Sequence, residues 1–195
     1  MPIVLATHNP HKLAEIRALL GSSSLSIVGL PDLAIADDPE ETGATFEENA
    51  LLKAEHAHRR TGQPAIADDS GLEVDALGGR PGVHSRRFTP EATALSNNRA
   101  LLAALEGVLD RRARFRCVVA LVARDVRTTV EGVCAGTIAK EPRGTNGFGY
   151  DPLFLPDDAP GQTMAELLPD EKNAISHRGR ALRKLAEALV ALRVA

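Results

Sequence analysis

The chain has few aromatic residues and little net charge. Aromatic residues make up 3% of its 195 residues, Trp is missing, and the formal net charge is -3. Proteins that bind single-stranded nucleic acid stack bases on aromatic side chains along a basic groove. A broad basic field is also what attracts nucleic acids over a distance. We therefore expect no nucleic acid partner.

Long apolar runs are also missing. Residues 1–7 are too short and become polar too soon for a signal peptide. No apolar run approaches the roughly 18 residues that a membrane span needs. We expect no membrane partner and a cytoplasmic location.

Cysteine is scarce, with only Cys117 and Cys134 in the sequence. The two lie in neighbouring strand-like segments and lack the paired spacing of a metal-binding knuckle. If those segments form a hairpin turning near residues 124–125, the thiols could lie close together. In a reducing compartment we expect both to stay free and to pack as small apolar groups.

The sequence contains enough apolar residues for a real core, since 44% of it is hydrophobic. The pattern predicts early strand and helix units: strands at 2–7 and 25–29 and one beginning at Pro64, and helices beginning at Pro10 and after Thr45. A half-buried strand at 72–77, a helix from Thr89, an antiparallel pair at 114–124 and 126–139, and a helix at about 176–192 follow. This mixture predicts an α/β fold with a mixed sheet, in one domain spanning 1–195, with two lobes and a cleft between them.

The segment Pro64–Gly71 is an apolar run that ends in Asp68, Asp69 and Ser70. Side chains alternate across a strand, so the two carboxylates should point to opposite faces. We therefore expect one of them to be catalytic. The alternative is a solvated turn, because these residue types are common in turns.

Two further segments offer groups for an anion and a metal. In the first, residues 7–12, a strand delivers backbone N–H groups and a lysine to a helix N-terminus, which favours phosphate; an ordinary capped helix with a surface lysine is the alternative. In the second, Glu40 and Glu41, together with Asp68 and Asp69, are carboxylates of the kind that hold Mg²⁺ beside phosphates, or else a solvated acidic cluster. Lys53, beside the small residues of its helix, either reaches into the cleft or snorkels to solvent.

Two late segments complete the candidate groups. Residues 144–152 combine glycines, which allow close backbone approach, with Phe148 and Tyr150, whose rings could face a nucleobase. Residues 171–178 place hydrogen-bonding side chains before a helix. A functionless glycine-rich hairpin and a simple helix cap are the respective alternatives.

Taken together, seven short motifs in register resemble the inosine/xanthosine triphosphate pyrophosphatase family. They are Thr7-x-Asn9-x-x-Lys12, Glu40-x-x-Gly43, Phe46-Glu47-Glu48-Asn49-Ala50, Ala67-Asp68-Asp69-Ser70-Gly71-Leu72, Gly78-Gly79-x-Pro81-Gly82, Phe148-Gly149-Tyr150-Asp151-Pro152 and Lys172-Asn173-Ala174-x-Ser176-His177-Arg178. The resemblance runs from the first strand to the last helix. It implies an elongated mixed sheet flanked by helices, two lobes with a central nucleotide-binding cleft, and a homodimer.

The resemblance also implies residue roles. Asp69 resembles the carboxylate that activates water and helps to hold Mg²⁺, with Glu40 as its metal partner and Glu41 as a rival for that place. The triphosphate site would comprise Thr7, His8, Asn9, Pro10, His11, Lys12, Lys53 and Ser70. The nucleoside and base site would comprise Phe148, Gly149, Tyr150, Asp151, Lys172, His177 and Arg178.

The implied activity is hydrolysis of non-canonical purine triphosphates (ITP, dITP and XTP) to the monophosphate and pyrophosphate. Mg²⁺, with Mn²⁺ as a substitute, would assist water attack at the α-phosphate. Two other functions stay open. A related pyrophosphatase could act on modified pyrimidine or canonical nucleotides, and a module without enzymatic activity could simply bind nucleotides.

Overall fold

The computed structural model describes residues 2–20 and 26–194, with side chains up to residue 189. The chain divides into two compact units. Unit 1 contains residues 1–69, 117–132 and 178–195, and unit 2 contains residues 70–116 and 133–177. The nucleotide-binding cleft expected from the sequence stays a prediction.

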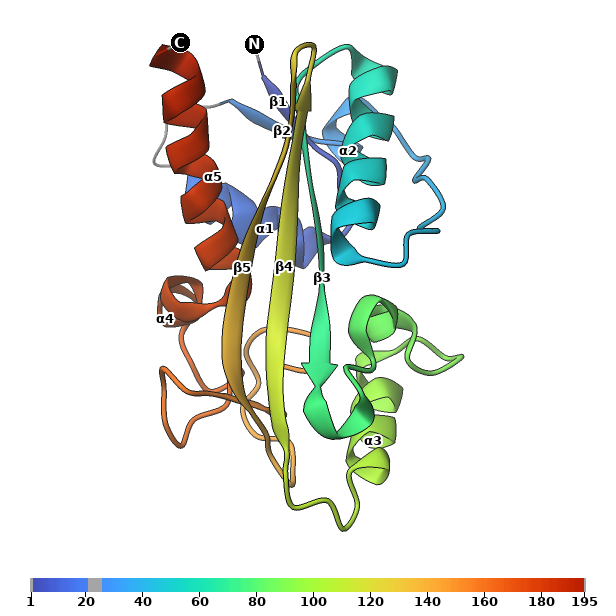
Figure 1. Ribbon diagram of the computed structural model, residues 1–195, viewed down its shortest axis with the longest axis vertical. Helices are drawn as coiled ribbons and strands as arrows, with labels where there is room; N and C mark the ends of the chain where they lie inside the picture. The colour runs from blue at the N-terminus through green and yellow to red at the C-terminus, as the bar shows by residue number, and fades with distance from the viewer. Residues whose placement is uncertain (1, 21–25, 195) are drawn as a thin grey trace. The chain divides into compact units, whose positions relative to one another are not determined.

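The strands form one mixed sheet in the order β2-β1-β3-β4-β5-β6 (Figure 1). β1 pairs in parallel with β2 and β3, and β5 pairs antiparallel with β6. The predicted α/β fold with a mixed sheet is therefore confirmed. In chain order the elements are β1 (Ile3–Leu5), α1 (Pro10–Leu20), β2 (Ile27–Gly29), α2 (Phe46–Thr61), β3 (Ala65–Val74), α3 (Ala94–Ala104), β4 (Arg112–Ala123), β5 (Val126–Ile138), β6 (Phe154–Pro156), α4 (Pro169–Ile175) and α5 (His177–Val194).

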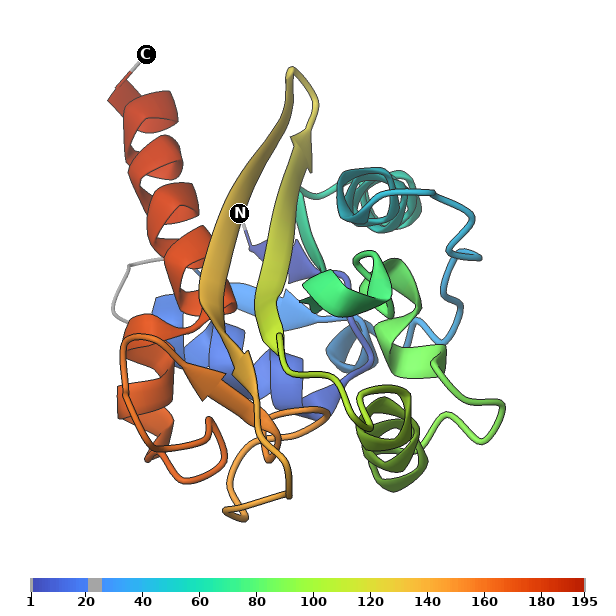
Figure 2. The same cartoon turned by 60° about the horizontal axis from the view of Figure 1, so that its bottom comes forward.

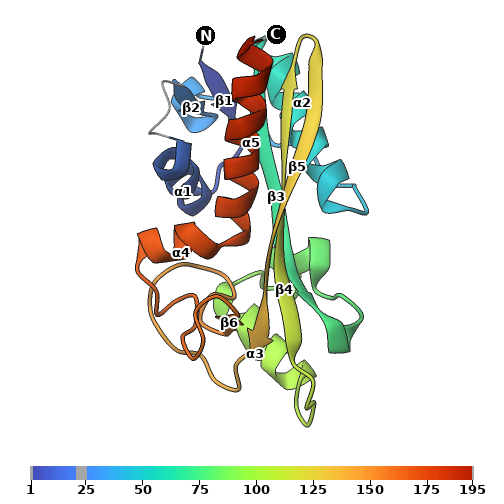
Figure 3. The same ribbon diagram turned by 60° about the vertical axis from the view of Figure 1, so that its left-hand side comes forward.

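In unit 1, helices cover both faces of the strands. α1 and α5 lie on one face and α2 lies on the other (Figure 3). On the first face, Ile16 and Leu182 pack with Ile66 in an apolar cluster. On the second, Ala50 and Ala54 of α2 are fully buried, which lets the helix backbone approach the sheet closely. The strand segment between these layers is buried on both faces.

Local sequence signals set the ends of the first two helices. Asn9 accepts hydrogen bonds from the backbone N–H groups of His11 and Lys12, and Pro10 opens α1. Thr45 and Glu48 form the reciprocal capping box of α2. Both predicted helix starts are confirmed.

Unit 2 has its own core around Phe115, Phe154 and Leu101. Figure 2 shows α3 beside the short 3-10 helix Gly82–Arg87. Asn97 of α3 joins the two, because it donates to the carbonyl of Arg86 and accepts from Thr89.

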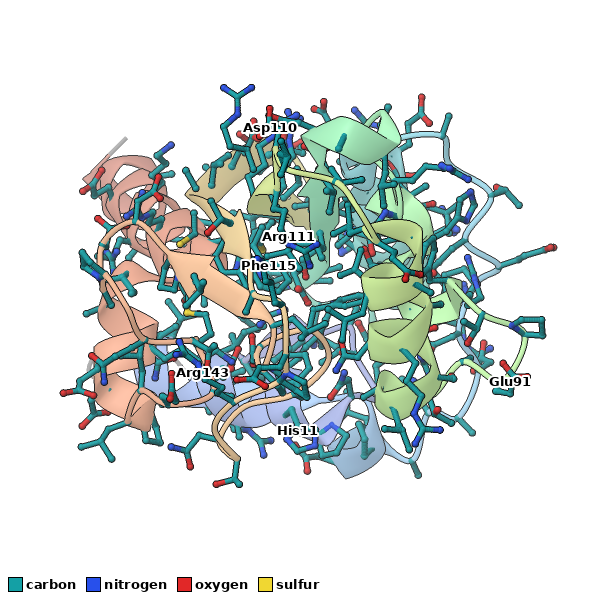
Figure 4. The ribbon with its side chains drawn as sticks, turned by 90° about the horizontal axis from the view of Figure 1, so that it is seen from below. His11, Glu91, Asp110, Arg111, Phe115 and Arg143 are labelled. Atoms are coloured by element: carbon teal, nitrogen blue, oxygen red, sulfur yellow. The ribbon has the colours of Figure 1, made fainter. Side chains whose placement is uncertain are left out.

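Arg111 fixes the start of β4 in unit 2. It points inward together with Phe115, whereas Asp110 lies on the outside (Figure 4). Its guanidinium donates to the carbonyl oxygens of Leu105, Ile138 and Ala139. One side chain thereby joins the start of β4 to two other backbone segments.

Two expectations about the middle of the chain are wrong. The strand expected at 72–77 is not a separate element, because β3 runs unbroken to Val74 and a 3-10 helix, Asp75–Leu77, replaces its last three residues. α3 begins at Ala94 and not after Thr89, because Thr93 and Ser96 form the capping box there. Ala92 has a φ of 50°, which is incompatible with a helix passing through it.

The C-terminal region contains a helix that the sequence reasoning missed. α4 precedes α5, and the helical conformation is interrupted between them at Ser176, which has an extended ψ of 154°. The signal was Pro169 with Glu171, whose carboxylate accepts from the backbone N–H of Leu168. No helix in the described ranges is long and apolar enough to cross a membrane.

The remaining expectations concern the second strand and the thiols. β2 begins at Ile27, and Leu25 of the expected strand lies outside the described residues. Cys117 and Cys134 are both buried thiols that are not joined in a disulfide, as expected. They belong to separate apolar clusters, Cys117 in that of unit 1 and Cys134 in that of unit 2.

Candidate active site

Asp68 and Asp69 lie side by side in β3 and face different partners. Asp69 accepts from the Lys53 ammonium at 2.9 Å and from the Asn49 amide at 3.3 Å, both on α2. Asp68 accepts from Lys12 of α1 at 2.9 Å and from Arg178 of α5 at 3.1 Å. The predicted alternation is confirmed. The solvated turn is wrong, because Asp68 is 2% exposed and Asp69 is 7% exposed.

The two carboxyl groups have opposite pKa shifts. Burial raises the pKa of Asp69, although the nearby Lys53 ammonium opposes that shift. Burial also acts to raise the pKa of Asp68, but Lys12 and Arg178 outweigh it and lower that pKa well below its ordinary value. A carboxylate with a raised pKa is a better proton acceptor, so Asp69 has the chemistry of a general base and Asp68 that of a permanent anion.

Lys53 joins the loop before α2 to β3. Its ammonium lies 3.1 Å from Glu41 and 2.9 Å from Asp69, and the residue is only 9% exposed. The snorkelling alternative is therefore wrong. Burial acts to lower the pKa of Lys53, but the surrounding carboxylates outweigh it and raise the pKa, so Lys53 stays charged.

The carboxylates around Lys53 fit a divalent cation that also binds phosphate. Asp69 and Glu41 converge on one ammonium, and carboxylate oxygens are the ligands that Mg²⁺ prefers. Within the described residues, no group of three or more His, Cys, Asp or Glu side chains is arranged to hold a metal ion. Mg²⁺ with one or two carboxylates usually completes its shell with water and substrate phosphate.

Glu40 and Glu41 can be distinguished by paired substitutions. If Glu40 is the metal ligand, Glu40→Gln should raise the Mg²⁺ concentration for half-maximal activity by about tenfold or more. Glu41→Gln should then mainly remove the ion pair with Lys53. It should leave the Mg²⁺ concentration for half-maximal activity nearly unchanged. Mg²⁺ titrations of both variants measure this, and the reverse pattern would assign the metal to Glu41.

Between β1 and α1, side chains of the same segment accept hydrogen bonds from several of the backbone N–H groups. Thr7 accepts from the backbone N–H of Asn9, and Asn9 caps the N–H groups of His11 and Lys12. The expectation of free N–H groups is therefore wrong for His11 and Lys12. Lys12 itself is held at Asp68, with its ammonium beside the buried strand.

Two histidines tie down the loop that carries Glu40 and Glu41. His8 contacts the carbonyl of Ile35 through Nε2 at 2.8 Å and the carboxylate of Asp38 through Nδ1 at 2.9 Å. His56 of α2 contacts Asp37 at 3.0 Å. Both partners of His8 are acceptors, so only the doubly protonated ring can donate to both.

His8 should therefore stabilise the protein in a pH-dependent way. The Ile35 carbonyl and the Asp38 carboxylate raise the pKa of His8 above its ordinary value. A raised pKa contributes stability that is complete below the unfolded-state value of about 6.5 and is lost as the pH rises through the folded-state value. The melting temperature of His8→Gln should fall below that of the wild type at about pH 6 and match it more closely at about pH 9. An equal difference at both pH values would contradict this.

In unit 2, Asp151 organises the glycine-rich loop. Its carboxylate accepts from the backbone N–H of Phe148 at 2.7 Å and from the Lys172 ammonium at 2.8 Å. Gly147 has a φ of 74°, and a Cβ there would lie 2.1 Å from the Asp151 carboxylate. Glycine is therefore required by this close approach.

Phe148 and Tyr150 have different surroundings. The Lys172 ammonium lies 4.8 Å from the centre of the half-buried Phe148 ring. Tyr150 is 5% exposed, belongs to the core of unit 2, and donates to the carbonyl of Ser85. The expectation that Tyr150 offers its ring face is therefore wrong, whereas Phe148 remains suited to that role.

The other predicted binding residues lie as follows. His177 stacks on Phe115 at 4.7 Å in unit 2. Arg178 belongs to unit 1, is 2% exposed, and is paired with Asp68 and Glu15. Pro10 and His11 are exposed, and Gly149 and Ser70 are half-buried.

Sequence reasoning assigned no role to Asn49, Glu15 or Phe115. Asn49 was part of a quoted motif, and its place one helical turn after the Thr45 cap could have indicated an inward position. Glu15 and Phe115 carry no such signal, because their partners lie far away in the sequence.

These features define an α/β protein in which two buried carboxylates of β3 pair with lysines of the helices that flank the sheet. The chain belongs to the Ham1 family, whose model matches residues 3–188. It is 51% identical over 191 residues to the dITP/XTP pyrophosphatase of Bacillus licheniformis, covering 96% of this chain and 97% of that one. It is 52% identical over 194 residues to the enzyme of the same name from Shigella flexneri, with 96% and 97% covered.

Solved structures agree with this membership. A HAM1 protein from Coxiella burnetii has a TM-score of 0.87 at 46% identity, covering 98% of this chain and 99% of that one. The Ham1 protein of Staphylococcus aureus has the same TM-score at 39% identity, with the same shares covered. The resemblance read from the seven motifs is thereby confirmed.

Proposed function

We propose that this protein hydrolyses the non-canonical purine triphosphates dITP, ITP and XTP to the monophosphate and pyrophosphate. The observation that carries the proposal is Asp69, a buried carboxylate with a raised pKa between Lys53 and Asn49. Relatives about half identical along nearly their whole length are dITP/XTP pyrophosphatases. The activity would remove non-canonical nucleotides from the cytoplasmic pool.

The residues of unit 1 supply the phosphate chemistry. Asp69 accepts the proton of the water that attacks the α-phosphorus. Lys12 and Lys53 offset negative charge that develops on the leaving pyrophosphate. Mg²⁺, held by Asp69 with Glu40 or Glu41 and replaceable by Mn²⁺, would lower the pKa of the water and neutralise phosphate charge when bound.

The residues of unit 2 supply base recognition. Phe148 offers a ring face, and Lys172, held by Asp151 beside that ring, offers a donor. A donor at the 6-keto oxygen pairs with hypoxanthine or xanthine but meets the amino group of adenine. A site built to hydrogen-bond one group rejects the mismatched analogue strongly, because the polar group is left unpaired. We further propose that the enzyme is a homodimer.

A panel of substrates tests this function. Purified protein should release pyrophosphate and monophosphate in equal amounts from dITP, ITP and XTP with Mg²⁺, and much less from ATP, GTP or modified pyrimidine triphosphates. In H₂¹⁸O the label should enter the monophosphate, since water attacks the α-phosphorus. Label in pyrophosphate, a preference for canonical or pyrimidine nucleotides, or binding without hydrolysis would reject the proposal.

A further inference from the structure

Asn49 contacts both the catalytic carboxylate and the loop before α2. It is 2% exposed and lies in the first part of α2. Its Oδ1 accepts from the backbone N–H of Gly43 at 2.8 Å, and its Nδ2 lies 3.3 Å from Oδ2 of Asp69. The contact with the Gly43 N–H fixes which end of the amide carries oxygen, so the NH₂ group must face the carboxylate.

The lack of a side chain at Gly43 leaves room for this amide. A Cβ on Gly43 would lie 2.6 Å from Oδ1 of Asn49 and 2.7 Å from Cβ of Glu48. Any larger residue would push the loop away from α2. Because Gly43 follows Glu40 and Glu41 by two to three residues, its position constrains where those carboxylates lie.

We propose that Asn49 is a positioning residue that fixes Asp69 relative to the loop carrying Glu40 and Glu41. The proposal rests on the proposed function of these carboxylates. Lys53 also links Glu41 with Asp69, but its ammonium is drawn toward phosphate when the substrate binds. The neutral amide of Asn49 has no such competing attraction. It therefore keeps Asp69 and the loop carrying Glu40 and Glu41 in fixed relative positions in the substrate complex.

The test compares Asn49→Ala, Asn49→Asp and Gly43→Ala with the control Glu48→Ala. Glu48 is the preceding residue of the same helix, and its carboxylate accepts from the backbone N–H groups of Ala44 and Thr45. Asn49→Asp keeps an acceptor for Gly43 but has no donor for Asp69. The readouts are kcat and KM for dITP, the melting temperature, and Mn²⁺ affinity measured by electron paramagnetic resonance with an α,β-methylene analogue of dITP.

We expect both Asn49 variants to lower kcat by about 10- to 100-fold and to weaken Mn²⁺ binding by about tenfold. The KM for dITP should change far less, and Gly43→Ala should show the same pattern. Glu48→Ala should lower the melting temperature while keeping kcat and Mn²⁺ affinity within about twofold.

Asn49→Ala that matches Glu48→Ala in kcat and Mn²⁺ affinity would overturn the proposal, as would Asn49→Asp that behaves like the wild type. The proposed function fails separately, if the wild type does not hydrolyse dITP. The Mn²⁺ measurement would still decide the role of Asn49 in that case, because it needs no turnover.

Discussion

Asp69→Asn is expected to abolish turnover while largely preserving nucleotide binding. Asparagine keeps the shape of aspartate and can still accept from Lys53 and Asn49 through its oxygen. It cannot take a proton from water, and it is a poor metal ligand. Removing a general base typically costs about 10²-fold or more in rate.

Single-turnover hydrolysis of dITP, together with calorimetric binding of its α,β-methylene analogue, measures both parts of this prediction. Asp110→Asn is a suitable control, because it removes an exposed carboxylate that pairs with the exposed Arg112. Near-normal turnover of Asp69→Asn would show that another group activates the water. Loss of binding as well as turnover would show that Asp69 mainly holds the nucleotide.

The parts of the fold that the sequence predicted depend on neighbouring residues. The caps at Asn9 and at Thr45 with Glu48 involve contacts within three residues, so local pattern was sufficient. The alternation of Asp68 and Asp69 is equally local, since successive side chains of a strand point to opposite faces. Alternation alone does not say which of the two carboxylates is catalytic, and Asp69 was singled out only by the resemblance to the family.

The parts that the sequence did not predict depend on distant partners. Asp68 and Asp69 can be buried in β3 because Lys12, Lys53 and Arg178 compensate their charges. Without those cations the same residues would be more favourable in a solvated turn. Arg178 lies 110 positions from Asp68, so no local pattern reveals the pairing.

The position of Tyr150 illustrates the same limit. Its motif predicted a ring exposed to a base, but its hydroxyl donates to the carbonyl of Ser85, 65 positions away, and its ring fills the core of unit 2. Buried tyrosine normally finds a partner for its hydroxyl group. Only the fold shows that this partner exists here.

Asp68→Asn is expected to destabilise the protein strongly. Asp68 has no exposed side-chain surface, and it pairs with Lys12 and with Arg178, which is itself 2% exposed. Asparagine leaves both cations without this counter-charge in a buried place, although Glu15 still contacts Arg178. Removing one partner of a buried ion pair costs about 3–5 kcal/mol of unfolding free energy.

The neighbouring substitution gives this prediction a sharp control, because the pKa shifts of the two residues have opposite signs. The pKa of Asp68 is lowered, so its ionised form stabilises the fold at every pH above its unfolded value of about 3.9. The pKa of Asp69 is raised by burial, so ionising it costs stability; Asp69→Asn relieves that cost, and Lys53 keeps its ion pair with Glu41, so the unfolding free energy should fall far less than in Asp68→Asn. Urea denaturation of both variants at about pH 7 measures the difference. Equal losses from the two substitutions would mean that Lys12 and Arg178 do not depend on Asp68, and that the charges around β3 are balanced in another way.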